Sequence, residues 1–272
     1  SRVVCPDSQF GPGEDESPNK VKFDDESVFT MADNLYWDFH HYPGWYTDFK
    51  DQYGSKDRFW PEDRARAVIC GEYSAEAMPD WERYRGLPWR STWLNNGRPA
   101  GDIERARLGR PLRVLRDSEA HISQAYHGMC IYHSAGYLRA TGCDGMISPI
   151  LADGLSEGQY HKGFFDLYRR AKLGYFAVRM IYEPTAVVGM GGDFVLSDGD
   201  SLHLVLVNDD VRRSGEQVDV YVLVKRLDGT QVDATQLDAS IDESGIVALG
   251  DYRPQFPDAG LYQIVYEVSP RD

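Results

Sequence analysis

The stretch Ala67-Val-Ile-Cys-Gly-Glu-Tyr-Ser-Ala-Glu76 decides the fold, because an apolar run stops at a glycine and is followed at once by a carboxylate and an aromatic ring. Strands of parallel sheets are covered on both faces and read as short continuous apolar runs. Where such strands close into a (β/α)8 barrel, the residues at their carboxyl ends face the active site. Glu72 is therefore a candidate catalytic carboxylate. The alternative is a solvated loop residue or a partner in a helix cap.

A second run of the same kind lies upstream. Residues 35–46, Leu-Tyr-Trp-Asp-Phe-His-His-Tyr-Pro-Gly-Trp-Tyr, are apolar and aromatic and end in polar rings and a Pro-Gly break. The connector over residues 48–66 has the length of a helix, which is the rhythm of βα repeats. We predict strands over residues 35–40 and 67–71, with their polar ends on one shared rim.

Periodicity predicts the elements that follow. Apolar or small residues at helical spacing indicate helices over residues 117–137 and 164–181, the second stopped by Pro184. A further strand is expected over residues 146–151, ending at Asp153.

After Pro184 the pattern becomes alternating and rich in turn residues, which predicts a small antiparallel sandwich of immunoglobulin-like size. The clearest hairpin signal is Asp228-Gly229. The expected strands cover residues 194–196, 201–208, 218–225, 246–249 and 261–268.

Four motifs resemble glycoside hydrolase family 2 and its relatives, a family of β-galactosidases, β-glucuronidases and β-mannosidases. They are residues 38–46 (Asp-Phe-His-His-Tyr-Pro-Gly-Trp-Tyr), 69–73 (Ile-Cys-Gly-Glu-Tyr), 172–179 (Lys-Leu-Gly-Tyr-Phe-Ala-Val-Arg) and 182–185 (Tyr-Glu-Pro-Thr). The resemblance implies that the first two are later barrel strands and that the last two are the final barrel helix and its exit into a β-sandwich. Two positions depart from the family pattern: Ser74 stands where a glycine is usual, and the last barrel strand, ending at Asp153, lacks an aromatic ending.

The resemblance places the family's nucleophile on Glu72 and implies substrate contacts for His40, Tyr42, Trp45 and Tyr73. Retaining glycosidases use two carboxyl groups about 5–5.5 Å apart, one as nucleophile and the other as acid and then base. Aromatic rings such as Trp45 also stack on the apolar face of a sugar. For His40 and Trp45 the alternative is ordinary core or loop packing.

Asp153 follows the last predicted strand of the barrel and is a candidate to bind a sugar hydroxyl. Its alternative is the N-cap of the next helix.

The number of strands sets the domain prediction. Residues 1–184 supply about four strand–helix units, whereas a barrel has eight and about 250 residues. We therefore predict an α/β fold, with the second half of a (β/α)8 TIM barrel over residues 1–184 and a small all-β immunoglobulin-like sandwich over residues 185–272. The resemblance implies that the acid/base Glu belongs to the missing first half, and no Asn-Glu pair occurs in the sequence. Because an open half-barrel exposes apolar strands and raw edges, we expect a partner chain that carries the N-terminal half.

Composition narrows the classes of partner. The net charge of −14 argues against nucleic acid or an anionic membrane, and no apolar run reaches the ~20 residues that span a bilayer. The four cysteines (5, 70, 130 and 143) show no metal-like pairing and are expected to be buried thiols. We expect neither a cofactor nor a metal, because no glycine-rich phosphate cradle opens a helix and the histidines at 121, 127 and 133 fall on different helix faces, where we expect them to be solvated.

The sequence thus predicts a retaining glycoside hydrolase of the β-glycosidase type, acting on O-glycosidic bonds of an oligo- or polysaccharide and active together with the missing half. Secretion or a periplasmic location is compatible with that activity. Two alternatives stay open. The chain is a non-catalytic carbohydrate-binding or scaffolding subunit, or it is a different barrel enzyme in which Glu72 is a general base.

Overall fold

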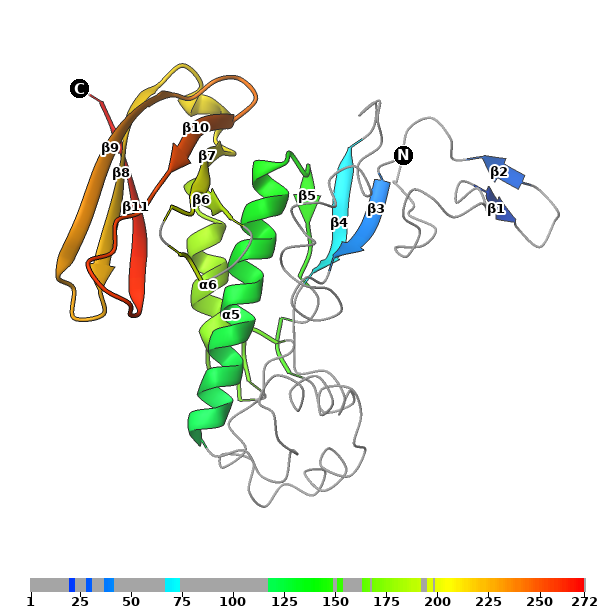
Figure 1. Ribbon diagram of the computed structural model, residues 1–272. Helices are drawn as coiled ribbons and strands as arrows, with labels where there is room; N and C mark the ends of the chain where they lie inside the picture. Colours follow the sequence, from blue (N-terminus) through cyan, green and yellow to red (C-terminus); the bar gives the residue numbers. More distant parts are fainter. Residues whose placement is uncertain are drawn as a thin grey trace. The chain divides into compact units, whose positions relative to one another are not determined.

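The computed structural model describes residues 20–22, 28–30, 37–41, 67–73, 117–148, 151–153, 163–166, 168–191, 195–197 and 199–271 (Figure 1). The chain forms two compact units, one from Ser1–Ala135 with Cys143–Arg179 and the other from Gly136–Gly142 with Met180–Asp272. The described residues contain several β-sheets and two α-helices, α5 (Asp117–Ala140) and α6 (Leu173–Ile181), and both helices continue from the first unit into the second. Neither of these helices is long and apolar enough to cross a membrane.

The first unit contains a parallel sheet in the order β3-β4-β5. Strand β3 covers Trp37–His41 and β4 covers Val68–Tyr73, so two of the predicted strands are confirmed as neighbours that run the same way. A separate antiparallel pair joins β1 (Lys20–Lys22) to β2 (Val28–Thr30).

The third strand of this sheet is shorter than predicted. Strand β5 is only Gly145–Met146, and its pairing with β4 ends where the Ile147 amide donates to the Cys70 carbonyl at 2.8 Å. Pro149 lies two residues further on and has no amide hydrogen with which to continue the ladder.

The predicted helix over residues 117–137 is confirmed as α5, but the helix predicted over residues 164–181 begins only at Leu173. The preceding residues fold back on themselves instead. Phe165 forms an antiparallel bridge with Ala171, and Asp166 closes the turn by accepting the Arg170 amide at 2.9 Å. This turn satisfies locally the backbone groups that a longer helix would have used.

Helices α5 and α6 approach closely at Gly128. A methyl group added there would lie 3.6 Å from the Ala177 side chain and 3.6 Å from the Leu173 carbonyl oxygen. The Leu173 amide, at the start of α6, donates to Gln124 Oε1 of α5 at 3.4 Å.

The second unit contains two antiparallel sheets of three strands each, in the orders β10-β7-β6 and β11-β8-β9 (Figure 1). Both sheets contribute apolar side chains to one core, because successive residues of a strand point to opposite faces. The strands are β6 (Thr185–Met190), β7 (Leu202–Asn208), β8 (Gln217–Arg226), β9 (Gln231–Ser240), β10 (Ile246–Tyr252) and β11 (Tyr262–Pro270). The core consists of Val187, Leu202, Leu204, Leu206, Val218, Val220, Val222, Val224, Ala239, Ile241 and Tyr252.

The β8–β9 hairpin confirms the Asp228-Gly229 turn. Gly229 has a φ of +89°, a conformation that glycine adopts without strain, and Asp228 Oδ1 accepts the Thr230 amide at 2.9 Å. Strands β6 and β9 were not predicted, and the strand expected over residues 194–196 does not form in the described part, 195–196.

Candidate functional site

Glu72 lies near the carboxyl end of β4, the central strand of the parallel sheet. Its register partner on β3 is His40, so the backbone brings these two predicted site residues to neighbouring positions. The polar ends of the two predicted strands therefore lie side by side at these two residues.

The pairing of β3 with β4 contains a one-residue irregularity. Phe39 pairs with Cys70, yet the next residue of β3, His40, pairs with Glu72, so that Gly71 is an extra residue on β4. An extra residue in one strand of a pair is a β-bulge, which re-aims the side chains that follow it.

Burial along β4 follows the bulge. Val68, Cys70 and Tyr73 are each 0% exposed, whereas Ile69 and Glu72 are partly exposed. Register partners present their side chains to the same face of a sheet, so Tyr73 shares the buried face with Cys70 and Glu72 shares the more open face with Ile69. Glu72 is thus on a face that solvent reaches.

The other predicted site residues are in different surroundings. Tyr73 is fully buried. Tyr42 and Trp45 lie outside the described residues. Roles for all three in substrate binding stay predictions.

Asp153 is buried in an ion pair that the sequence analysis did not foresee. Its two carboxylate oxygens lie 3.2 and 3.1 Å from Lys172 Nζ, and its Oδ1 also accepts the Gly163 amide at 3.0 Å. The side chains of Asp153 and Lys172 are 0% and 2% exposed. Burial raises the pKa of the Asp153 carboxyl, although the Lys172 ammonium and the Gly163 amide act in the opposite direction. Its binding of a sugar hydroxyl stays a prediction, and the observed contacts give it a structural role.

Gly163 is required at its position beside Asp153. A methyl group added to Gly163 would lie 2.6 Å from Asp153 Oδ1, 2.7 Å from the Ala152 carbonyl carbon, and closer still to the Asp153 nitrogen. Only glycine allows two stretches of backbone to approach this closely.

Two buried side chains were missed as structural residues. Lys172 belongs to a motif that the sequence analysis quoted, but its partner is 19 residues away, which no local pattern reveals. His127 of α5 was expected to be solvated and is 0% exposed, stacked on Phe164 with ring centroids 6.1 Å apart. A methyl group added to Gly174 of α6 would lie 2.6 Å from the Nδ1 atom of His127. That expectation was wrong because α6 covers this side of α5.

Within the described ranges, no three side chains of His, Cys, Asp or Glu gather closely enough to hold a metal ion. Cys70 and Cys130 are buried, as predicted, whereas Cys143 is partly exposed and Cys5 lies outside the described residues. The Cys70 thiol donates to the Glu72 carbonyl oxygen at 3.2 Å, and therefore spans the bulge at Gly71.

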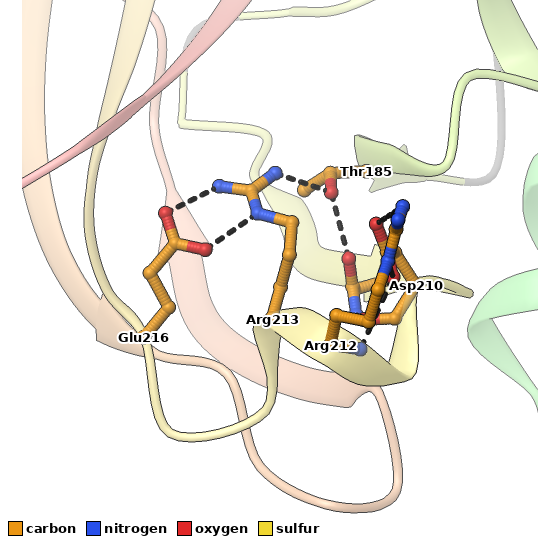
Figure 2. Close-up of polar contacts among 6 residues, drawn as sticks. Thr185, Asp210, Arg212, Arg213 and Glu216 are labelled. Atoms are coloured by element: carbon orange, nitrogen blue, oxygen red, sulfur yellow. Dashed lines mark hydrogen bonds and ion pairs between the residues drawn. The ribbon is translucent and has the colours of Figure 1, made fainter.

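The second unit carries a polar cluster where its first strand begins (Figure 2). Arg213 donates to both carboxylate oxygens of Glu216, at 2.6 and 2.9 Å, and to Thr185 Oγ1 at 2.6 Å. Next to it, Arg212 makes two charged hydrogen bonds with Asp210, at 2.8 and 2.7 Å, and these contacts lower the pKa of Asp210 to about 2. Every charged group in this cluster has a partner, so it has the character of a structural network.

Solved structures of glycosidases align with most of this chain. A β-D-mannosidase from Dictyoglomus thermophilum matches 85% of this chain with a TM-score of 0.54 at 15% identity. An exo-chitosanase from Amycolatopsis orientalis matches 90% with a TM-score of 0.48 at 16% identity, and an FMN-binding β-glucuronidase from Faecalibacterium prausnitzii matches 87% with a TM-score of 0.36 at 14% identity. No protein-family model and no curated protein sequence matches the chain.

The chain spans about a third or less of the length of these proteins: 28% of the β-mannosidase, 31% of the exo-chitosanase and 32% of the β-glucuronidase. At this level of identity the similarity concerns the fold alone. The chain therefore has a fold similar to part of the β-mannosidase.

Proposed function

We propose that this chain is the carboxy-terminal part of a retaining β-glycosidase, with the second half of a (β/α)8 barrel followed by an immunoglobulin-like sandwich. The observation that carries the proposal is the position of Glu72 near the carboxyl end of the central parallel strand, on the more open face of the sheet. The fold similarity to part of a β-D-mannosidase supports it. Carboxyl ends of parallel strands are where barrel enzymes carry their catalytic groups.

In this proposal Glu72 is the nucleophile. Its carboxylate oxygen attacks the anomeric carbon, the bond to the leaving oxygen breaks, and a glycosyl ester forms on Glu72. A second carboxyl group protonates the leaving oxygen and then removes a proton from the water that hydrolyses the ester. That second group belongs to the N-terminal half of the barrel, which we propose is carried by a partner chain.

We propose His40, Tyr42 and Trp45 as substrate contacts. His40 is the register partner of Glu72 on β3, and Tyr42 and Trp45 follow β3 closely in the sequence. Imidazole and phenol groups donate hydrogen bonds to sugar hydroxyls, and an indole ring offers a flat apolar surface for stacking. Tyr73 and Asp153 complete the proposed set.

Covalent labelling of Glu72 tests the proposal. A 2,4-dinitrophenyl 2-deoxy-2-fluoroglycoside carries a leaving group that departs without a proton, so the reaction does not depend on the acid/base carboxyl. The full chain, incubated together with the N-terminal half and with gluco, galacto and manno forms, is expected to release dinitrophenolate and to gain the mass of one fluorosugar on Glu72. Glu72→Gln is the matched control, because an amide of the same shape is a poor nucleophile. The absence of an adduct with every sugar, in the presence of the N-terminal half, would reject the proposal.

A non-catalytic carbohydrate-binding or scaffolding subunit is the second candidate. Two of the six predicted site residues favour the scaffolding form: Tyr73 is buried, and Asp153 is bound to Lys172 and Gly163. Saturable sugar binding in the absence of any adduct on Glu72 would favour this candidate.

A further inference from the structure

The bulge in β4 has a direct consequence for the proposed nucleophile. In a regular strand, residues 70 and 72 would share one face and residues 69 and 71 the other. Cys70 is 0% exposed, so a regular strand would turn Glu72 toward the buried face. A carboxylate turned that way would lose its solvation and would favour the protonated state, which is not nucleophilic.

We infer that Gly71 is a positioning residue: the extra residue that it supplies to β4 turns Glu72 onto the open face of the sheet, next to Ile69. This inference rests on the proposed role of Glu72. Its basis is the register, in which one step on β3, from Phe39 to His40, matches two steps on β4, from Cys70 to Glu72.

The burial pattern supports the same reading independently of the register. The fully buried residues of β4 are separated by two positions before the bulge, from Val68 to Cys70, and by three positions across it, from Cys70 to Tyr73. The partly exposed Ile69 and Glu72 are also three positions apart. A step of three within a strand is the signature of one inserted residue.

The Cys70 thiol holds the bulge. It donates to the Glu72 carbonyl oxygen at 3.2 Å, and this contact joins the residues on either side of Gly71. Cys70 thus fixes the backbone of the residue whose side chain is proposed to react. A glycine between them is the residue type that most often marks a bulge inside a strand.

Cysteine alkylation tests the geometry without any activity. The variants Val68→Cys, Ile69→Cys and Glu72→Cys of the full chain are treated with iodoacetamide, and modification at each position is measured by peptide mass spectrometry. We expect positions 69 and 72 to react at least ~10-fold faster than position 68 and the native Cys70, because a buried thiol reacts only when the structure opens. Protection of position 72 together with Cys70 would overturn the inference.

A substitution and an insertion test whether the bulge controls the reactivity of Glu72. Gly71→Ala keeps the number of residues, whereas insertion of one alanine between Gly71 and Glu72 moves the carboxylate one position along and turns it toward the buried face. With the dinitrophenyl fluoroglycoside, we expect Gly71→Ala, which keeps the extra residue in β4, to slow labelling by far less than the insertion. We expect the insertion to slow labelling by about 100-fold or more, as for a misplaced catalytic group.

Thermal unfolding of the insertion variant, followed by circular dichroism, verifies that it is folded. If the insertion variant is unfolded, the labelling rates of Cys70→Ser and Cys70→Ala are compared in its place. Serine keeps a donor across the bulge and should preserve the labelling rate, while alanine removes the donor and should lower the rate several-fold. Equal rates for wild type, insertion and Cys70→Ala would overturn the inference. Failure of the wild type to be labelled in the presence of the N-terminal half would reject the proposed function, and the alkylation pattern would still test the bulge.

Discussion

Asp153 in the first unit and Asp210 in the second each pair with one cation. Their pKa values nevertheless shift in opposite directions. Asp153 lies 3.1 Å from Lys172 Nζ and Asp210 lies 2.7 Å from Arg212. The Asp153 and Lys172 side chains are 0% and 2% exposed, whereas those of Asp210 and Arg212 are 20% and 86% exposed. Burial raises the pKa of Asp153, while hydrogen bonds from Arg212 lower that of Asp210 to about 2.

The contrast teaches that solvation, not the presence of a partner, decides what an ion pair contributes. Removing two charges from water costs several kcal/mol per ion, which their attraction offsets only in good geometry. A pair that keeps its water incurs little of this cost and gains little, because water screens the attraction. Substitution of one partner should therefore lower the free energy of unfolding strongly in the buried pair and only slightly in the exposed pair.

The largest effect is expected from Lys172→Met. This substitution keeps most of the side-chain volume but leaves the Asp153 carboxylate buried without its cation. Breaking a buried pair in this way typically costs about 3–5 kcal/mol. Urea unfolding of the full chain, monitored by circular dichroism, measures the loss.

The matched control for that variant is the double substitution Lys172→Met with Asp153→Asn. It removes both charges and leaves an amide that still accepts the Gly163 hydrogen bond, so most of the lost stability should return. A double variant as unstable as Lys172→Met alone would mean that shape rather than charge holds this region together.

A smaller effect is expected from Gly163→Ala. The added methyl group would collide with the Asp153 backbone and with Asp153 Oδ1, which the Lys172 contact holds in place. Overpacking of this kind costs about 1–3 kcal/mol. Gly128→Ala is the control, because a methyl group there meets its neighbours at 3.6 Å, an ordinary contact, and replaces a glycine inside α5. It should be neutral or stabilising by up to about 1 kcal/mol in the same urea experiment.

A pH series separates the two carboxylates by the sign of their effect. The folded pKa of Asp210 is below its ordinary value of 3.8, so the contribution of Asp210 to stability is present above pH 3.8 and is lost as the pH falls toward 2. The folded pKa of Asp153 is above 3.8, so the folded state binds its proton more readily and the contribution of Asp153 grows as the pH falls.

Urea unfolding of wild type, Asp210→Asn and Asp153→Asn between about pH 6 and pH 3 measures how the free energy of unfolding of each protein changes with pH. On acidification, the advantage of the wild type over Asp210→Asn should shrink, while its stability relative to Asp153→Asn should increase. Slopes of the same sign would contradict the assignment of burial as the dominant influence on Asp153.

Local patterns in the sequence predicted the parts of the fold that local physics decides. The apolar run before Glu72 gave β4, helical spacing gave α5, and Asp228-Gly229 gave the β8–β9 hairpin. The apolar pattern over residues 164–181 was misread as one helix, because the Asp166 turn and the Phe165–Ala171 bridge replace its first part.

The features missed in the first unit depend on contacts between distant residues. Lys172 and Asp153 meet only after the chain has folded back, and the covering of His127 depends on where α6 lies. Gly71 left a readable signal, a glycine inside a strand, but its meaning as a bulge needed the register of β3 against β4. The position of Glu72 on its strand was thus predictable from sequence, and the face that it occupies was not.

The smallest effect is expected from Arg212→Ala, which removes the cation of the exposed pair (Figure 2). Arg212 and Asp210 are two residues apart on the surface, and the Asp210 side chain also accepts the Arg212 backbone amide at 3.1 Å, which the substitution keeps. We expect the urea midpoint to stay within the error of the measurement. Arg213→Ala is the matched comparison, because Arg213 binds Glu216 and also Thr185, which is 28 residues away, and is more buried, with 26% of its side chain exposed. Its loss should lower the midpoint measurably, and an equal response of the two arginine variants would show that burial does not separate strong from weak ion pairs in this protein.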